Sequence, residues 1–212
     1  MNKKYEFTGE TKILNDGTIL HRIRSLIPFK TSYFIVKPGE LGGWIENENN
    51  LSHTGNAWVY GNAQIYGNAQ IYGNARVYGN AQIWSNAWVW GDAEVCGNAR
   101  VYGDARVYGN AMIGGGAWVY GNAEVCGNAE VYGDAEVYKT YHTLVVGPIG
   151  SRSSFTTFYK NKNNNIQVKC GCFLGTIDEF LKKVYETHKD SKHGVIYRNA
   201  ALLAMLQIEL EQ

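Results

Sequence analysis

The sequence predicts a mainly β protein: a left-handed parallel β-helix of hexapeptide repeats, with an N-terminal β cap and a small C-terminal α+β head. The first observation is a run of fourteen consecutive hexads without an insertion, from Gly55 to Tyr138. The second is that each hexad places an aliphatic residue two positions after an alanine. The third is the count of 25 glycines in 212 residues, which exceeds the usual share of about 7%. Repeats of six residues are typical of β-helices.

A single hexad contains the parts of one flat side and one corner. Ala57 and Val59 lie two positions apart, so on a strand both point to the same side, which we expect to be the interior. Trp58 between them points outward. The Gly-Asn pair that follows suits a corner, because both residues tolerate positive φ. Three such sides close a coil of eighteen residues, and stacked coils form a prism roughly 22 Å long at about 4.8 Å per coil.

The period of eighteen sorts the outward residues into columns. It places Arg76 next to Glu94 and Arg106 next to Glu124, contacts between neighbouring strands that each contribute up to about 1 kcal/mol. Aromatic residues next to the corners form columns of their own: Tyr60-Tyr78, Tyr66-Trp84-Tyr102-Tyr120-Tyr138 and Tyr72-Trp90-Tyr108. Two interpretations stay open, a set of stacking ladders or a face that binds a partner subunit.

The composition changes at both ends of the repeat, which divides the chain into residues 1–40, 41–138 and 139–212. The first segment alternates like hairpin strands and would cover the open edge of the β-helix, whose first irregular coil begins near Leu41. The last segment predicts strands at 142–146, 155–160 and 166–170, then two helices. Thr176 and Glu179 form a capping box before the helix at 177–188, and the second helix covers 197–211.

Charge and cysteine content exclude several classes of protein. The 20 basic and 19 acidic residues leave a formal net charge of +1, which argues against capture of a nucleic-acid polymer or an anionic membrane by bulk charge. No apolar run approaches the roughly 20 residues of a membrane span. The sequence shows no export signal, so we expect a cytoplasmic protein whose four cysteines are reduced thiols.

Histidine and cysteine supply little for catalysis or metal binding. Acyltransferases and zinc enzymes built on hexapeptide β-helices need histidine at the coils, and none occurs between residues 54 and 141. We therefore expect no catalytic residue, no metal and no cofactor. His53 is expected to be a buried or capping residue. Cys170 and Cys172 are expected to form a packed thiol pair on one strand face, and Cys96 and Cys126 lie on different sides of the prism, too far apart to bridge.

The best candidate site lies in the head. One glycine-containing loop supplies hydroxyls and an arginine, and a second glycine turn runs into a helix N-terminus; these are the usual parts of a phosphate site. Aromatic side chains, including Phe158, would stack a base or ribose. The alternative is that the glycines only make turns and the arginine pairs with an acidic surface. The candidate ligand-binding residues are Gly150, Ser151, Arg152, Ser153, Tyr159, Gly171, Phe173, Thr176 and His142.

Several segments together resemble a family of hexapeptide-repeat proteins carried by phages and prophages. They are YEFTGETK, ELGGWIENENNLS, the GNAxVY run, and PIGSRSSFTTFY with VKCGCFLGTIDEF. The resemblance implies a non-enzymatic phage protein in the cytoplasm of an infected bacterium, a dimer or trimer that binds and sequesters a nucleotide signal of a bacterial defence response. A structural or oligomerisation scaffold of a phage is the alternative. An acyltransferase or nucleotide hydrolase with a composite site around His142 or His53 is a third hypothesis.

Overall fold

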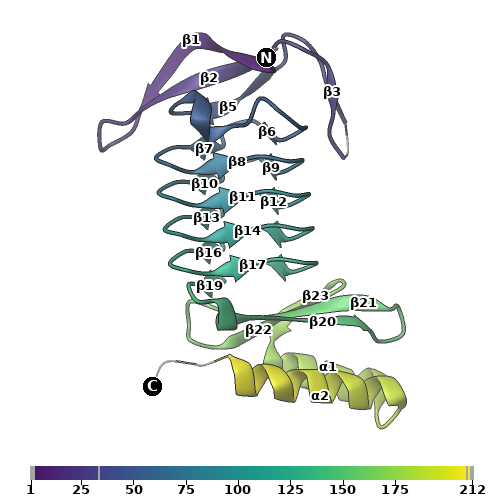
Figure 1. The fold of residues 1–212 in the computed structure, drawn as a ribbon. Helices are drawn as coiled ribbons and strands as arrows, with labels where there is room; N and C mark the ends of the chain where they lie inside the picture. Colours follow the sequence, from purple (N-terminus) through teal and green to yellow (C-terminus); the bar gives the residue numbers. More distant parts are fainter. Residues whose placement is uncertain (1–2, 33, 209, 211–212) are drawn as a thin grey trace.

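The molecule is an elongated stack of three parts, as Figure 1 shows: N-terminal strands, a solenoid, and a C-terminal head of strands and two helices. The computed structural model describes residues 3–32, 34–208 and 210. This arrangement confirms the predicted fold class of a parallel β-helix with a β cap and an α+β head. Among the described helices, none has the length and apolar character needed to cross a bilayer.

The hexads form three flat sheets of parallel strands, each strand pairing with the one eighteen residues later. Face 1 consists of β5 (Leu41–Ile45), β7 (Gln64–Ile65), β10 (Gln82–Ile83), β13 (Arg100–Val101), β16 (Trp118–Val119) and β19 (Glu136–Val137). Face 2 consists of β8 (Gln70–Ile71), β11 (Trp88–Val89), β14 (Arg106–Val107) and β17 (Glu124–Val125). Face 3 consists of β6 (Trp58–Val59), β9 (Arg76–Val77), β12 (Glu94–Val95), β15 (Met112–Ile113) and β18 (Glu130–Val131).

The interior of the solenoid is filled by the alanines and aliphatic residues of the hexads. Ala99 and Val101, for example, are fully buried, as the alternation of side chains along a strand requires. At the corners, the asparagines bond to one another from coil to coil. The Asn56 side-chain amide donates to Asn74 at 3.1 Å, and Asn74 donates to Asp92 at 3.0 Å. Asp92 and Asp104 therefore fit a corner column, because each accepts from the asparagine of the preceding coil.

Corner glycines are required both by backbone conformation and by the close approach of the next coil. Gly109 and Gly127 share a positive φ, +71° and +66°. A Cβ on Gly109 would lie 3.0 Å from the backbone nitrogen of Gly127, whereas a Cβ on Gly127 meets nothing within 4 Å. Ser85, at φ 60°, shows that the corner accepts an L side chain at the cost of strain.

We expect Gly109→Ala to lower the free energy of unfolding by about 2 kcal/mol, since both strain and crowding oppose it. Gly127→Ala, the matched control, is expected to cost about 1 kcal/mol, because only the strain applies. Urea titration followed by tryptophan fluorescence measures both. Equal losses for the two variants would show that the contact between coils contributes nothing.

The predicted columns on the outside of the solenoid are present. Arg76 pairs with Glu94, and Arg106 pairs with Glu124 at 3.4 Å. The ring of Trp84 stacks on Tyr66 and Tyr102, with centroids 5.7 and 4.4 Å apart, and the column through Trp90 stacks in the same way. Stacking ladders are thus confirmed for the columns through Trp84 and Trp90, whereas Tyr60 of the third predicted column packs edge-on against Phe34. A partner on these columns stays a prediction.

The N-terminal strands extend face 1 beyond the first coil. Strands β1 (Tyr5–Ile13) and β2 (Ile19–Ser25) form an antiparallel hairpin, and β2 pairs with β5. The first coil is irregular as predicted, because Ile45 pairs with Ile65 and the spacing is twenty residues instead of eighteen. It contains the 3₁₀ turn η1 (Glu48–Asn50). His53 serves the cap, since its ring stacks on Tyr5 with centroids 4.2 Å apart.

A second hairpin of the N-terminal segment lies against face 3. Its strands are β3 (Phe29–Lys30) and β4 (Ile35–Val36). The Phe29 ring packs edge-on against Trp58, and the Phe34 ring packs edge-on against Tyr60. Trp58 is therefore fully buried although its position in the hexad points outward.

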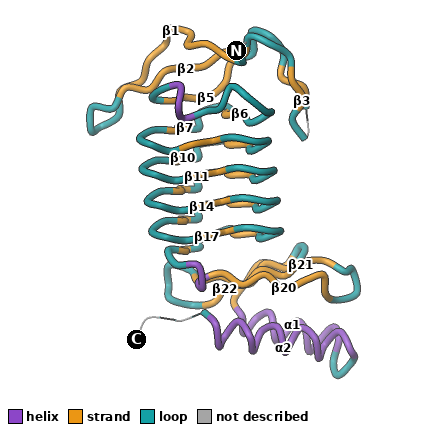
Figure 2. Tube along the Cα trace, in the orientation of Figure 1, coloured by secondary structure: helices purple, strands orange, loops and turns teal. Residues whose placement is uncertain are grey.

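The head is an antiparallel sheet between the solenoid and two helices, which Figure 2 shows at the end opposite the cap. After the 3₁₀ turn η2 (Thr140–His142) come β20 (Thr143–Ile149), β21 (Ser154–Lys160), β22 (Ile166–Cys170) and β23 (Phe173–Thr176). Helices α1 (Ile177–His188) and α2 (Lys192–Gln207) follow. Helix α2 begins five residues earlier than predicted, because Ser191 caps it by accepting from Gly194. Residues 209 and 211 of the predicted helix lie outside the described residues.

Strand β21 closes the end of the solenoid with side-chain hydroxyls. Thr157 and Tyr159 point toward face 3, where the Thr157 hydroxyl accepts from the backbone N–H of Glu130 at 3.0 Å. The Tyr159 hydroxyl accepts from the N–H of Tyr132 at 3.3 Å and donates to its carbonyl at 3.1 Å. These side chains occupy the place that another coil would take. Phe158 between them points to the helices and belongs to the head core.

Candidate functional site

The register of the head sheet separates the nine predicted site residues into two groups. Ile149 pairs with Ser154 across the turn at 150–153, and Thr156 pairs with Cys170, which pairs with Phe173. The two glycine-containing turns therefore meet at one end of the sheet, which we call the turn end. The residues brought together there are Gly150, Ser151, Arg152, Ser153, Gly171 and Phe173.

The other three predicted residues lie at the opposite end of the sheet. Tyr159 pairs with Thr143, next to His142, and Gln167 of the adjoining strand pairs with Thr176. Tyr159 lies five positions along β21 from Ser154, a distance of about 17 Å. Including these residues in one site with Arg152 was therefore wrong. Sequence reasoning missed the separation of these residues, because it is decided by the pairing of strands that are distant along the chain.

Each of these three side chains has a structural role instead. His142 is 1% exposed and packs edge-on against Tyr138, with ring centroids 4.3 Å apart. Tyr159, and Phe158 beside it, are fully buried, so neither ring is placed to stack a base. Thr176 caps α1 as predicted, but Glu179 accepts from its backbone N–H at 2.7 Å and Asp178 is also in the first turn. The two carboxylates occupy the helix end that an anion would need.

At the turn end, Tyr197 of α2 reaches the first turn. A Cβ on Gly150 would lie 1.8 Å from its hydroxyl oxygen, so only glycine fits there. The Cys170 sulfur lies 4.0 Å from the same oxygen. Burial, with Cys170 as a second cause, raises the pKa of Tyr197 to about 12, so the hydroxyl keeps its proton at neutral pH. The positive charge of Arg152 acts in the opposite direction and lowers the pKa of Tyr197, so Arg152 lies close to this hydroxyl.

A hollow of about 110 Å³ opens beside Tyr197. Lys183 and His188 of α1 line it together with the half-buried ring of Phe173. Arg152, Lys183 and His188 give this end several cationic or hydrogen-bonding groups, which attract an anion. Pockets for whole small molecules measure about 300–1,000 Å³, so this hollow accommodates a phosphate-sized group and leaves the rest of a larger ligand outside.

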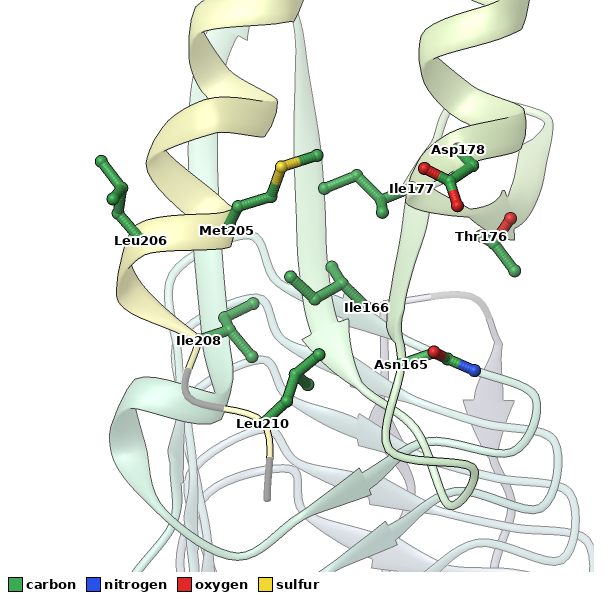
Figure 3. A pocket seen from close by; sticks show the side chains of 9 residues that line it. All are labelled: Asn165, Ile166, Thr176, Ile177, Asp178, Met205, Leu206, Ile208 and Leu210. Carbon is green, nitrogen blue, oxygen red and sulfur yellow. The ribbon is translucent and has the colours of Figure 1, made fainter. Parts of the chain in front are cut away.

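A cavity of about 590 Å³ lies at the opposite end of the head (Figure 3). Ile166, Ile177 and Met205 line it with other apolar side chains, and Asp178 contributes a carboxylate. In Figure 3, Met205 points toward Ile177, while Leu206 points away from the cavity. This lining repels an anion and suits an apolar occupant. Sequence reasoning missed the cavity, although the apolar residues of α2 were the available signal.

A second missed feature is a pocket of about 390 Å³ on face 3, lined by Phe34, Tyr60, Arg76 and Tyr78. It lies where the β3–β4 hairpin meets the wall. The Arg76 and Glu94 side chains beside it are only 4% and 7% exposed, and the Tyr78 hydroxyl donates to Glu94 at 3.1 Å. Burial raises the pKa of Tyr78. The thiol of Cys96 and, to a smaller extent, the Glu94 carboxylate raise it further.

The expected thiol pair in the head is absent. Gly171 and Cys172 form the two-residue turn between β22 and β23, and Cys172 is exposed. Cys170 instead accepts from the Thr156 hydroxyl at 3.2 Å. The prediction was wrong because it extended the strand through the turn, which moves the second thiol off the shared face. Within the described residues, no three His, Cys, Asp or Glu side chains group as metal ligands.

The coils, the ladders and the two closed ends define a β-solenoid protein with an N-terminal cap and a C-terminal head. The family described as YdcK Beta solenoid repeat matches the chain over residues 69–84, 93–107 and 105–121. The match covers coils of the solenoid and no residue of the head. A comparison with curated proteins gives no match.

Proposed function

We propose that this chain is a non-enzymatic binding protein that holds a phosphate-bearing, nucleotide-type ligand at the turn end of the head. The observation that carries the proposal is the meeting of the two glycine-containing turns beside Tyr197 and Arg152. In this role the solenoid is a rigid stem. The resemblance to phage proteins suggests that the ligand is a nucleotide signal of a bacterial defence response, which the protein sequesters unchanged.

The residues at the turn end would each make a different kind of contact with the ligand. Arg152 offers a planar pair of donors that matches phosphate oxygens. Lys183, which also pairs with Glu186 at 3.8 Å, would add a second positive charge. Tyr197 offers a hydroxyl that stays a donor at neutral pH. Phe173, at the rim of the hollow, would stack on a base or a ribose. None of these groups is a nucleophile activated by a neighbouring base, which agrees with binding without turnover.

Replacing Arg152 by alanine is expected to raise the dissociation constant for such a ligand about 10- to 100-fold, the range for one charge-assisted hydrogen bond. Isothermal titration with a panel of cyclic and ADP-ribose-type nucleotides measures the effect. Arg100→Ala, on the solenoid wall, is the matched control and should leave the affinity unchanged. No heat with any nucleotide of the panel would contradict the proposal, and so would equal affinities of the Arg152 and Arg100 variants.

Binding and turnover are separated by what happens to the ligand. A nucleotide released by heat denaturation should be recovered intact, as shown by chromatography and mass spectrometry. A cleaved product, or turnover of acetyl-coenzyme A, would instead favour a nucleotide hydrolase or an acyltransferase.

A scaffold protein is the second candidate function. Trp88 and Trp118 on the solenoid walls are each 40% exposed, and α2 carries further exposed apolar side chains. Such surfaces suit protein contacts. Large, open-ended assemblies in light scattering would favour the scaffold, whereas a small discrete oligomer would count against filament formation.

A further inference from the structure

Helix α2 has apolar residues on two opposite sides. One side faces the sheet and α1 and is buried: Tyr197, Ala200, Ala201 and Ala204, followed by Ile208 just beyond the end of the helix. The other side carries Val195, Leu202 and Leu206, which are 43%, 55% and 83% exposed. At 100° per residue, this outer set is centred half a turn away from the buried set. A helix that is apolar on all sides is normally covered on all sides.

The outer set has the spacing of a helix–helix seam. Val195, Asn199, Leu202 and Leu206 are separated by four, three and four residues, the alternation of d and a positions in a coiled coil. Asn199 occupies an a-type position, where a single asparagine fixes register and oligomeric state. The exposed side of α1 carries Tyr185 but is otherwise charged, with Lys182, Lys183 and Glu186.

We infer that this outer seam of α2 is an interface with a second copy of the same chain, formed around a two-fold axis. None of the four seam residues is charged. In a two-fold contact the seam meets itself, so a neutral seam avoids repulsion between like charges, and an asparagine finds a polar partner. A partner that is recognised by its charge would require side chains of the opposite charge in the seam, and the seam has none. Leu203, 49% exposed, flanks the seam and would widen the contact.

The size of the surface sets the strength of the dimer. Helix α2 has 16 residues and is about 24 Å long, and α1 beside it makes a layer about 20 Å wide. This footprint is below the roughly 800 Å² per partner of a standard stable interface. We therefore expect a dimer that forms and dissociates with concentration. In Figure 1 the helices lie at the end of the molecule away from the solenoid, so the dimer joins two chains head to head.

Sedimentation equilibrium of the full chain tests the interface. The wild-type mass should approach twice the chain mass of 23.7 kDa as concentration rises. Leu202→Glu with Leu206→Glu should raise the dissociation constant at least about 100-fold, because a two-fold interface contains each substitution twice. Leu174→Glu is the matched control, since Leu174 is 45% exposed on β23, away from the seam. Asn199→Leu should tighten association, because it replaces a polar residue in the seam.

The outcomes separate this inference from ligand binding. The seam variants should keep the helical circular dichroism and the nucleotide affinity of the wild type, since neither Leu202 nor Leu206 lines the hollow at the turn end. Small-angle scattering should give the dimer about twice the longest dimension of the seam variant. A wild type that is monomeric at all concentrations overturns the inference, as does a dimer that the seam variants leave intact or one with solenoids side by side. Sedimentation of a monomer with anionic phospholipid vesicles would assign the seam to a membrane instead.

Discussion

Replacing Glu94 by alanine is expected to lower the free energy of unfolding by about 3–5 kcal/mol, the usual cost of breaking a buried ion pair. Glu94 and Arg76 pair on face 3, where both side chains are almost fully buried. Removing the carboxylate takes the opposite charge away from a guanidinium whose side chain is almost fully buried. Urea titration followed by tryptophan fluorescence measures the loss.

Glu124→Ala is the matched control for this variant. Glu124 pairs with Arg106 across the same interval of eighteen residues, but the two side chains are 35% and 56% exposed. Its loss should cost less than about 1 kcal/mol. The double variant Arg76→Met with Glu94→Met should recover most of the stability, because apolar residues of similar size replace a buried pair without penalty. A similar loss for Glu94→Ala and Glu124→Ala would refute the role given to burial.

Tyr159→Phe should lower the free energy of unfolding by about 2–4 kcal/mol. The Tyr159 hydroxyl pairs with both the N–H and the carbonyl of Tyr132 at the last strand of face 3. Without the hydroxyl, two backbone groups at a partly buried junction lose their partner, at about 1–3 kcal/mol each. Hydrogen exchange should locate the loss at the final coil, since each coil contacts only its neighbours.

The control for Tyr159→Phe is Tyr185→Phe on α1. Tyr185 is 64% exposed, so its hydroxyl exchanges freely with water and its loss should change stability by less than about 0.5 kcal/mol. The comparison also tests whether Tyr159 has a structural role, because a ligand-binding residue would affect affinity rather than stability. If Tyr159→Phe weakened nucleotide binding and left stability unchanged, Tyr159 would belong to the ligand site after all.

The solenoid could be predicted from the sequence because the information for each side lies within one hexad. Alanine and an aliphatic residue two positions apart define the inward side, and the glycine and asparagine define the corner, without reference to distant residues. The regular period then fixes the register of the columns. The capping box of α1 could be predicted for the same reason, since Thr176 and Glu179 are three residues apart.

The candidate site could be predicted only in part, because it depends on contacts between distant segments. The two glycine turns were recognised, but the strand register that brings Arg152 near Gly171 and removes Thr176 from them is set by pairing across the head. Tyr197 lies on α2, which joins the site through packing alone. The burial of Arg76 depends on a hairpin forty residues earlier, whose position no local pattern specifies.

Because the cross-section has three sides, the orientation of the head relative to the cap can change only in steps of one side when hexads are added or removed. Duplication of one whole coil would move the two ends about 4.8 Å further apart and leave their relative direction the same. Duplication of a single hexad would instead turn the head by about a third of a revolution, because the next strand would begin on the adjacent sheet. Lengthening of the gene in units of eighteen codons therefore increases the distance between the cap and the head without changing their relative orientation.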